Sequence, residues 1–473
     1  MKPHVDDGFR NRRRGLDATR RDFLKVGALG LGGLTFPWLL GNPARGAGAR
    51  DYVRDKSVVF LFLSGGASQF ETFDPKMTAP AEFRSLNGEI RTSLPGITFG
   101  GTLPRLASMA HRLAVIRSFV GPQDSAHDGA IRRVLKAGSA DPAGASIGAI
   151  AARLAGSVHP TTATPTFIQL ADPEPGGEYE EARGRYYVGN SPGSLGPAYA
   201  PFDPSREGDL RSNMTLRVPV ERLTDRRALL SAFDNLQREL DVNGRMATHD
   251  AGQRQAFEVL RGECRTAFDL SRENPGVLDR YDTSRIIVGY SGSSRSANYR
   301  DHPSPLGRHL LLARRLCEAG CGVVTINSPA WDSHGDGVHP NIVYTMEHEA
   351  RALDHAVTAF IEDVAQRGLT DRILLVIATE FGRTPRIDRA GGRDHWPGLC
   401  PLVLAGGGWR MGQVIGRSDA RAERPNGEPI STRNLLGTIL QTLFDTNRLR
   451  LAESAPPNLV RMIEESEPIV HLT

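Results

Sequence analysis

The sequence predicts an α/β fold in which helices cover both faces of a mostly parallel central sheet, and three observations support this. Continuous apolar runs at 57–63, 323–327 and 373–378 have the composition of strands that are buried on both faces. Helical patterns lie between these runs, as in three-layer α/β/α sandwiches. Polar residues follow the ends of the runs, which is where ligands gather in open α/β sheets.

The first half of the chain is expected to supply three strands. Ser57–Leu63 is apolar almost throughout, which favours a place at the centre of the sheet. Residues 113–118 and 166–170 are expected to be two further strands. The segment 173–204 is rich in Gly, Pro and Tyr, which predicts a long ordered loop instead of a regular element.

The middle of the chain predicts a helical insertion, from about 202 to 304, within one large domain at 50–473. Residues 221–268 have helical spacing, and their apolar stripe is more typical of core packing than of a binding face. The stripe consists of Leu229, Leu230, Phe233, Leu236 and Leu240. A helix over 306–319 is then expected to lead back into the sheet.

Imidazole and carboxylate groups follow the strands of the second half. Asp332 and His334 come after the strand at 323–327, and Glu380 comes after the strand at 373–378. Asp394 and His395 stand directly before a third expected strand at 401–405. Such groups at one sheet edge are typical cation ligands. The alternative for Asp332 and His334 is a turn-capping carboxylate and a packed imidazole, with Asp336 and His339 as further candidate ligands nearby.

These segments resemble the C-terminal half of the alkaline-phosphatase-like superfamily, which contains phosphatases, sulfatases and phosphomutases. From about Ser57 to Phe444 the chain resembles more closely a bacterial family of exported proteins known as domain-of-unknown-function family 1501. The resemblance implies one or two divalent cations at the sheet edge, of identity Zn, Ca, Mg or Mn. The phrases that carry it are Leu63–Ser68, Thr72–Lys76, Ala313–Gly320, Trp331–His334, Glu380–Pro385, Gly392–Pro397 and Ala405–Gly408.

The resemblance also implies further ligands. Glu71 stands where the family has Asp, with a reach longer by about 1.5 Å, and Asp74 is intact. Both are therefore candidate ligands, or caps of the following turn. Glu380 takes the place of an Asp-His pair, and Phe381 replaces its His. His395 matches the last metal-binding His, and Asp394 is expected to orient that imidazole or to bind the cation.

The nucleophile is implied less directly. Relatives place Ser or Thr at a helix N-terminus, where backbone amides favour an anion. The matching segment here contains Ser125, His127 and Asp128, ahead of a helix that ends near Gly138. The nucleophile is expected to be either Ser125 or a metal-activated water. The alternative is that Ser125 has no catalytic role and only caps the N-terminus of the helix.

Two arginines and the cysteines complete the candidate site. Arg383 and Arg393 are expected either to clamp an anion bidentately or to form structural ion pairs. No Cys or Ser heads the Cys/Ser-x-Pro-x-Arg motif of formylglycine sulfatases, which excludes that class. The four cysteines are expected to be unpaired and mostly buried.

The N-terminus predicts export. Thr19-Arg-Arg-Asp-Phe-Leu-Lys25 matches the twin-arginine signal, and the apolar segment 26–40 is short for a membrane span. Ala47-Gly-Ala49 supplies a cleavage site, so residues 1–49 are expected to be removed in the periplasm or on secretion. The expected partners are the twin-arginine machinery and an ester substrate, with no stable membrane span in the mature protein.

The charge excludes a nucleic-acid-binding role. The chain carries 58 Lys and Arg residues against 54 Asp and Glu residues. Removing residues 1–49 takes away nine basic and four acidic residues, which leaves 49 against 50. The mature protein is nearly neutral and has no basic patch with interleaved aromatic residues.

Two functions of different class follow from these observations. The first is an exported metal-dependent hydrolase of phosphate or sulfate esters, on small molecules, polysaccharide or another envelope polymer. The second is a periplasmic or envelope binding protein that keeps the fold without turnover. The ligand candidates favour the hydrolase, whereas Phe381 and the missing nucleophile motif favour the binding protein.

Overall fold

The structure is a computed structural model, and it describes residues 51–136, 138–139, 141, 143–171, 177–204, 263–288, 302–337 and 339–472. The expected export signal and cleavage site lie outside the described residues, as does most of the expected helical insertion. The single-domain boundary at residue 50 therefore stays a prediction.

A seven-stranded sheet forms the centre of the fold, with the order β13-β4-β12-β9-β1-β8-β5. β1 (Ser57–Leu63) lies between β8 (Val323–Ser328) and β9 (Ile373–Ala378) and is parallel to both, as its apolar composition predicted. β5 (Phe167–Leu170) is parallel to β8. The predicted mostly parallel α/β sheet is confirmed.

One strand of this sheet runs against the others. β12 (Leu402–Gly406) is antiparallel to β9 and to β4 (Ala114–Ile116), and β13 (Gln413–Ile415) is parallel to β4. An antiparallel strand enters the sheet at the edge where its parallel neighbours leave it. The residues before β12 therefore lie at the same edge as those after β1, β8 and β9.

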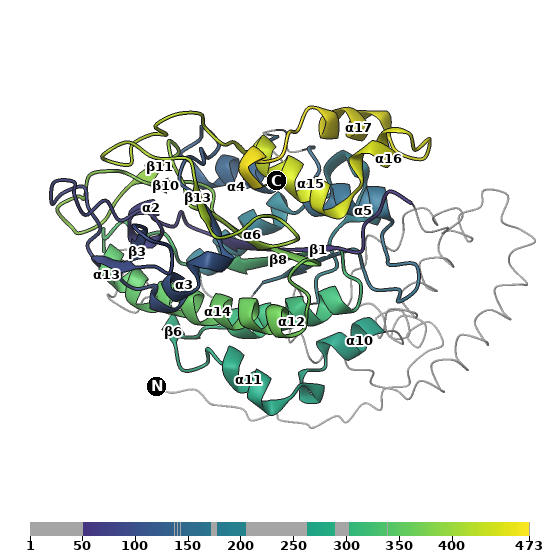
Figure 1. Cartoon of the computed structure of the whole chain (residues 1–473), viewed down its shortest axis with the longest axis horizontal. Coiled ribbons are helices and arrows are strands. Elements are labelled where there is room, and N and C mark those ends of the chain that lie inside the picture. The colour runs from purple at the N-terminus through teal and green to yellow at the C-terminus, as the bar shows by residue number, and fades with distance from the viewer. Residues whose placement is uncertain are drawn as a thin grey trace, which may run out of the picture. The chain divides into compact units, whose positions relative to one another are not determined.

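Helices cover both faces of the sheet (Figure 1). α12 (Leu306–Glu318) and α14 (Arg351–Gln366) pack together on one face, and α4 (His127–Leu135), α5 (Ile147–Ala155) and α15 (Thr432–Leu443) cover the other. Apolar side chains of β1 and of the second helical layer share one buried cluster, which includes Phe60, Phe62, Ile131, Ile150 and Leu436. The three-layer sandwich is confirmed.

The segment 177–204 differs from the predicted loop. It forms helix α6 (Gly177–Gly189) and two short 3-10 turns. Tyr186 of α6 is fully buried and its ring stacks on Phe62, with the centroids 6.5 Å apart. At Gly189, where α6 packs on α4, an added Cβ would lie 2.6 Å from Leu135 Cδ1, so a larger residue would require that side chain to move. Tertiary packing thus overrides the local composition.

Buried ion pairs attach the described parts of the predicted insertion to the helices α12 and α14. Arg314 of α12 is almost fully buried, and it donates to Glu273 at 2.6 Å and to Asp363 at 2.8 Å. The elements of this region are α10 (Glu263–Phe268), the 3-10 turn Leu270–Arg272, α11 (Pro275–Tyr281), β6 (Ile287–Val288) and β7 (His302–Pro303).

The remaining elements are short. They are α2 (Gln69–Thr72), β2 (Glu89–Arg91), β3 (Thr98–Gly100), α3 (Pro104–Ser108), the 3-10 turn Ala110–Arg112, α13 (Ile342–Thr345), the π-helical turn η6 (Met346–Ala350), β10 (Gly382–Arg383), β11 (His395–Trp396), α16 (Thr446–Arg450), α17 (Pro457–Glu464) and the 3-10 turn Val470–Leu472. All four cysteines are free and buried, as expected. Among the described residues, no helix combines the length and apolar composition of a membrane span.

Candidate metal centre

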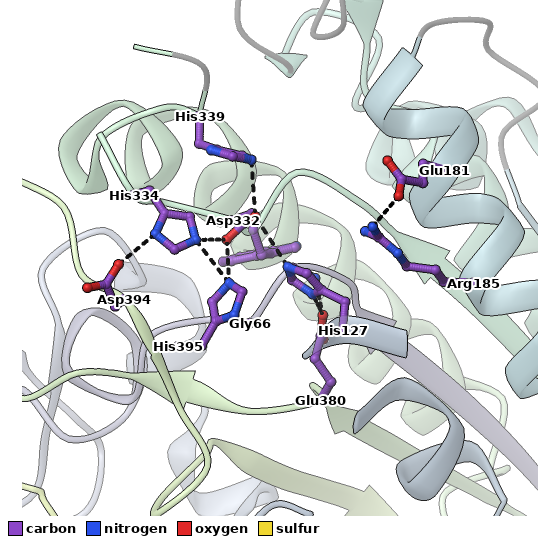
Figure 2. A network of polar contacts seen from close by, with 12 residues as sticks. Gly66, His127, Glu181, Arg185, Asp332, His334, His339, Glu380, Asp394 and His395 are labelled. Carbon is purple, nitrogen blue, oxygen red and sulfur yellow. Dashed lines mark hydrogen bonds and ion pairs between the residues drawn. The ribbon is translucent and has the colours of Figure 1, made fainter. Parts of the chain in front are cut away.

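The carboxylate of Asp332 is surrounded by four imidazoles at the sheet edge (Figure 2). Asp332 follows β8 and is buried, and its Oδ1 lies 2.9 Å from His334 Nε2 and 3.2 Å from His395 Nε2. Its Oδ2 lies 3.3 Å from His127 Nε2 and 3.4 Å from His339 Nε2. In all four rings the atom that faces Asp332 is Nε2.

These groups come from three separate parts of the chain. His334 and His339 lie with Asp332 in the loop after β8, and His395 begins β11, ahead of the antiparallel β12. His127 is the first residue of α4, whose N-terminus carries the positive end of the helix dipole. The sheet topology is what brings them to one edge.

Each imidazole has an acceptor at its other nitrogen. A carboxylate lies within 3.0 Å of Nδ1 in three of the rings, and a backbone carbonyl lies 2.7 Å from Nδ1 of His395. An acceptor at Nδ1 fixes the proton there, which leaves the Nε2 lone pair of a neutral ring free for a cation. The pairs are His127 with Glu380, His334 with Asp394, His339 with Asp336, and His395 with the carbonyl of Ser125.

The spacing of these atoms suits a bound cation. Ligands at about 2.0–2.1 Å from a tetrahedral Zn²⁺ are separated from one another by about 3.3 Å. The Nε2 atoms lie 2.9 to 3.4 Å from the oxygens of Asp332, and those of His334 and His395 lie 2.9 Å apart. Ligand atoms of His127, Asp332 and His395 all lie within 4.8 Å of one another. The donors therefore fit a divalent cation.

Charges within the centre shift its protonation. Burial opposes the charged form of Asp332, but Arg383 and the neighbouring imidazoles hold the pKa of this carboxyl well below its usual value. Burial would lower the pKa of His127, but hydrogen bonds to Asp332 and Glu380 raise it to about 9. Burial and the positive charge of Arg383 lower the pKa of His395. Without a cation, His127 therefore holds a proton at neutral pH.

Arg383 is buried beside Asp332. Its side chain is fully buried, and its Nη2 donates to Asp332 and to the carbonyl of Gly65. Nε donates to the carbonyl of Gly66 at 2.7 Å, and Nη1 donates to that of Arg393 at 2.9 Å. The sequence left open whether Arg383 clamps an anion or forms a structural ion pair. In the structure its guanidinium forms an ion pair with Asp332.

Arg393 is likewise buried away from the four imidazoles. It donates to the carbonyls of Thr384 at 2.9 Å and Arg84 at 3.0 Å, and its guanidinium lies over the ring of Phe70. The carboxylate of Glu71 lies 3.9 Å from Arg393 Nη2. Arg393 holds loops together in this arrangement and does not face the centre.

Gly65 allows the backbone to approach the centre closely. Its φ is +119°, and an added Cβ would meet the backbone nitrogen of Asp332 at 2.6 Å. Its own N–H donates to Glu380 Oε1 at 2.7 Å. Glycine is therefore required here both for the positive φ and for the close packing.

The two carboxylates after β1 contact residues other than the four imidazoles. Glu71 is fully buried and accepts hydrogen bonds from Ser85 Oγ at 2.6 Å, Asn87 Nδ2 at 2.9 Å and the backbone N–H of Leu86 at 3.1 Å. The 85–87 segment thus donates hydrogen bonds to both oxygens of this carboxylate. The side chain of Glu71 serves as an anchor for that segment.

Asp74 is engaged in a second set of contacts. Its carboxylate lies 3.2 Å from Lys76 Nζ and 3.4 Å from Arg117 Nη1, and it accepts a hydrogen bond from Ser418. Lys76 lies in the loop after α2, Arg117 follows β4, and Ser418 follows β13. In this arrangement Asp74 links three loops, and its role as a ligand stays a prediction.

The helix α4 segment also differs from expectation. Ala126 is the N-cap of α4, so the exposed Ser125 precedes the cap and is not the cap itself. Asp128 is exposed and pairs with Arg185 of α6 at 2.9 Å. Of the three candidates here, His127 is the one whose side chain contacts Asp332. The resemblance offered His127 as one of three candidates in this segment, and its contact partners lie more than 200 residues away.

Glu380 and Phe381 contact two of the imidazoles, those of His127 and His395. Glu380 is fully buried and accepts from His127, so it is placed as an outer partner, whereas the sequence suggested a ligand. The ring of Phe381 stacks on His395, with the centroids 4.2 Å apart and the planes 27° apart. His339, a weaker candidate in the sequence, lies beside Asp332 with Asp336 behind it.

The chain belongs to the family described as "Protein of unknown function (DUF1501)", whose family model matches residues 55–457. A search of curated proteins found no match.

Several solved structures resemble the chain at 11% sequence identity. A Bacteroides thetaiotaomicron protein, described with the metabolism of multiple glycosaminoglycans, covers 88% of this chain and 76% of its own, with a TM-score of 0.38. The PsFucS1 sulfatase from Pseudoalteromonas sp. covers 82% and 68%, with a TM-score of 0.36. A TAB5 alkaline phosphatase mutant with bound Mg covers 79% and 96%, with a TM-score of 0.31. Similarity at this level says nothing about the reaction.

Proposed function

We propose that this member of the DUF1501 family is an exported, metal-dependent hydrolase of phosphate or sulfate esters. The observation that carries the proposal is the convergence of imidazole Nε2 atoms on the carboxylate of Asp332 at 2.9 to 3.4 Å. Imidazole and carboxylate ligands with an open position are typical of catalytic cation sites. A packed core would not need four imidazoles whose second nitrogens all have acceptors.

The cation would be held by Asp332, His334 and His395. When bound, it would polarise an ester oxygen and lower the pKa of a water molecule. The chain supplies the fixed geometry: Asp394 orients His334, and the Ser125 carbonyl orients His395. Ligands that are already oriented need not reorganise when the substrate arrives.

The attacking group in this proposal is water, with Ser125 as the alternative. Ser125 is exposed and precedes the N-cap of α4, which is one position too early for the first amides of the helix. Its contact with the centre is made through its backbone carbonyl. A Ser125→Ala variant that retains turnover would favour water, whereas loss of turnover with normal cation binding would favour a covalent step.

One observation favours a second candidate function, a binding protein that holds a cation without turnover. Phe381 stacks on His395 where the superfamily resemblance implies a further imidazole, and the carboxylates of Glu71 and Asp74 have other partners. A centre with fewer ligands than the phosphatases have could bind an ester group without cleaving it.

The test is an ester assay on purified mature protein. Aryl phosphate and aryl sulfate are offered after removal of bound cations and after their return. Turnover that disappears with chelation, returns with a cation and is abolished by Asp332→Asn supports the hydrolase. His111→Ala is the matched control, because His111 is exposed and contacts Ser93. A cation-loaded protein that cleaves neither ester would favour the binding protein.

A further inference from the structure

We propose that His127 is itself a cation ligand, and that the imidazole-rich centre it completes selects a borderline transition cation such as Zn²⁺ over Mg²⁺ and Ca²⁺. This inference rests on the proposed metal-dependent function and adds to it the chemical class of the cation. It also assigns to α4 a role other than presenting a nucleophile.

The position of His127 supports direct ligation. Its Nε2 lies 3.3 Å from Asp332 Oδ2, and His127, Asp332 and His395 offer three ligand atoms within 4.8 Å of one another. The rings of His127 and His395 meet edge to face, with the centroids 4.5 Å apart. With His127 these three ligand atoms surround one cation position, and His127 approaches it from the side of the sheet that α4 covers.

Glu380 prepares His127 for this role. Its Oε1 accepts from His127 Nδ1 at 2.9 Å and from the N–H of Gly65 at 2.7 Å, and its Oε2 accepts from Thr379 Oγ1 at 3.0 Å. Glu380 is fully buried, so turning it toward the cation would break all three contacts. Its carboxylate therefore acts through the imidazole, which it orients and makes more basic.

The donor atoms determine which cation fits. Ca²⁺ takes six to eight oxygen ligands, and Mg²⁺ prefers oxygen ligands and several waters. Here the carboxylates of Glu71, Asp74 and Glu380 have other partners, which leaves Asp332 as the carboxylate at the hub of the imidazoles. Nitrogen-rich sites favour Zn²⁺ and its transition-metal neighbours.

Cation binding to the mature protein tests the inference without any assay of turnover. Stripped protein is titrated with Zn²⁺ against a chelator of known affinity, and with Co²⁺ followed by its visible absorption. Mg²⁺ or Ca²⁺ in a thousandfold excess should displace neither. Displacement by either would overturn the inference.

Variants assign the ligand. His127→Ala should weaken Zn²⁺ binding more than 100-fold, and Glu380→Gln should weaken it about 10–100-fold, as losses of outer partners do. His348→Ala is the control, because His348 of η6 is half-buried and its ring packs on Tyr344 of α13. Circular dichroism checks folding, and unchanged Zn²⁺ affinity in folded His127→Ala protein would refute ligation. If that variant does not fold, Glu380→Gln and the cation preference of the unaltered protein still decide.

The two proposals can fail separately. A Zn²⁺-selective protein that cleaves no ester would reject the hydrolase and keep this inference. A protein that hydrolyses esters with Ca²⁺ or Mg²⁺, and binds Zn²⁺ no better, would keep the hydrolase and reject this inference.

Discussion

The Nε2 atoms of His334 and His395 lie 2.9 Å apart, although 61 residues separate them in the chain. Each ring has an acceptor at Nδ1, so two neutral rings would direct lone pairs at each other. Either a proton or a cation must lie between them. This pair is the most direct indication that the edge of the sheet is built around a positive charge.

Removing one ligand should empty the centre without unfolding the protein. We expect His395→Ala and Asp332→Ala each to lower the amount of bound metal strongly, because a site of three or four ligands loses much of its affinity for the cation when one ligand is removed. Elemental analysis of the purified protein measures the metal, and circular dichroism measures the helix content. His111→Ala should change neither, and full metal occupancy in both ligand variants would show that these residues only pack or cap.

The affinity for the cation should rise with pH. The pKa of His127 is raised to about 9, so below that pH a cation must displace its proton. The apparent affinity should therefore increase by about tenfold per pH unit between pH 7 and 9, and should fall steeply below roughly pH 6 as other imidazoles protonate. Competition titrations at several pH values check this, and an affinity independent of pH over that range would count against ligation by His127.

Glu71 should prove to be structural. We expect Glu71→Ala to lower the free energy of unfolding by about 3 kcal/mol, because Ser85 and Asn87 lose a buried acceptor and Arg393 loses its nearest carboxylate. The bound metal should not change. Denaturant unfolding and elemental analysis together decide, since a variant that loses metal but not stability would show that Glu71 is a ligand.

His309 should make the protein less stable in acid. Burial and the neighbouring Arg308 lower its pKa to about 4, so the unfolded chain binds this proton more readily than the folded one below pH 6.5. Stability from this group is complete above pH 6.5 and is lost as the pH falls toward 4. Between pH 7.5 and 4.5 the free energy of unfolding of His309→Leu should therefore fall by about 2–3 kcal/mol less than that of the unaltered protein. Equal losses in the two proteins would contradict the assignment.

Export should depend on the paired arginines. Replacing Arg20 and Arg21 by Lys should leave unprocessed protein in the cytoplasm, because the export receptor reads the two guanidinium groups. Fractionation followed by immunoblotting measures this. Normal amounts of mature protein in the periplasm would reject the twin-arginine assignment.

The strands and the sheet edge could be predicted because apolar runs mark buried strands wherever they occur. Asp332, His334 and His395 adjoin such runs, and the structure places them together. The antiparallel direction of β12 could not be predicted, since its composition is the same in either direction. Nor could the placement of His127, because its approach to Asp332 depends on how α4 packs on the sheet.

Glu71 has contacts that the resemblance did not imply. Its position after the central strand implied a ligand, but the longer side chain reaches the 85–87 segment, whose hydrogen-bond donors satisfy it. Helix α6 shows the limit of composition, because its Gly and Tyr residues suit a loop until Tyr186 finds a place beside Phe62. In both cases the deciding contacts are distant in sequence.

The ion pair between Arg383 and Asp332 bears on the order of assembly. Asp332 already has a permanent positive neighbour, and the imidazoles around it can accept protons, so the buried carboxylate is neutralised before any cation arrives. In small zinc-dependent domains, by contrast, binding of the metal supplies the folding free energy. Maturation of this protein can therefore proceed in two independent stages, in which the apoprotein folds first and the cation binds afterwards.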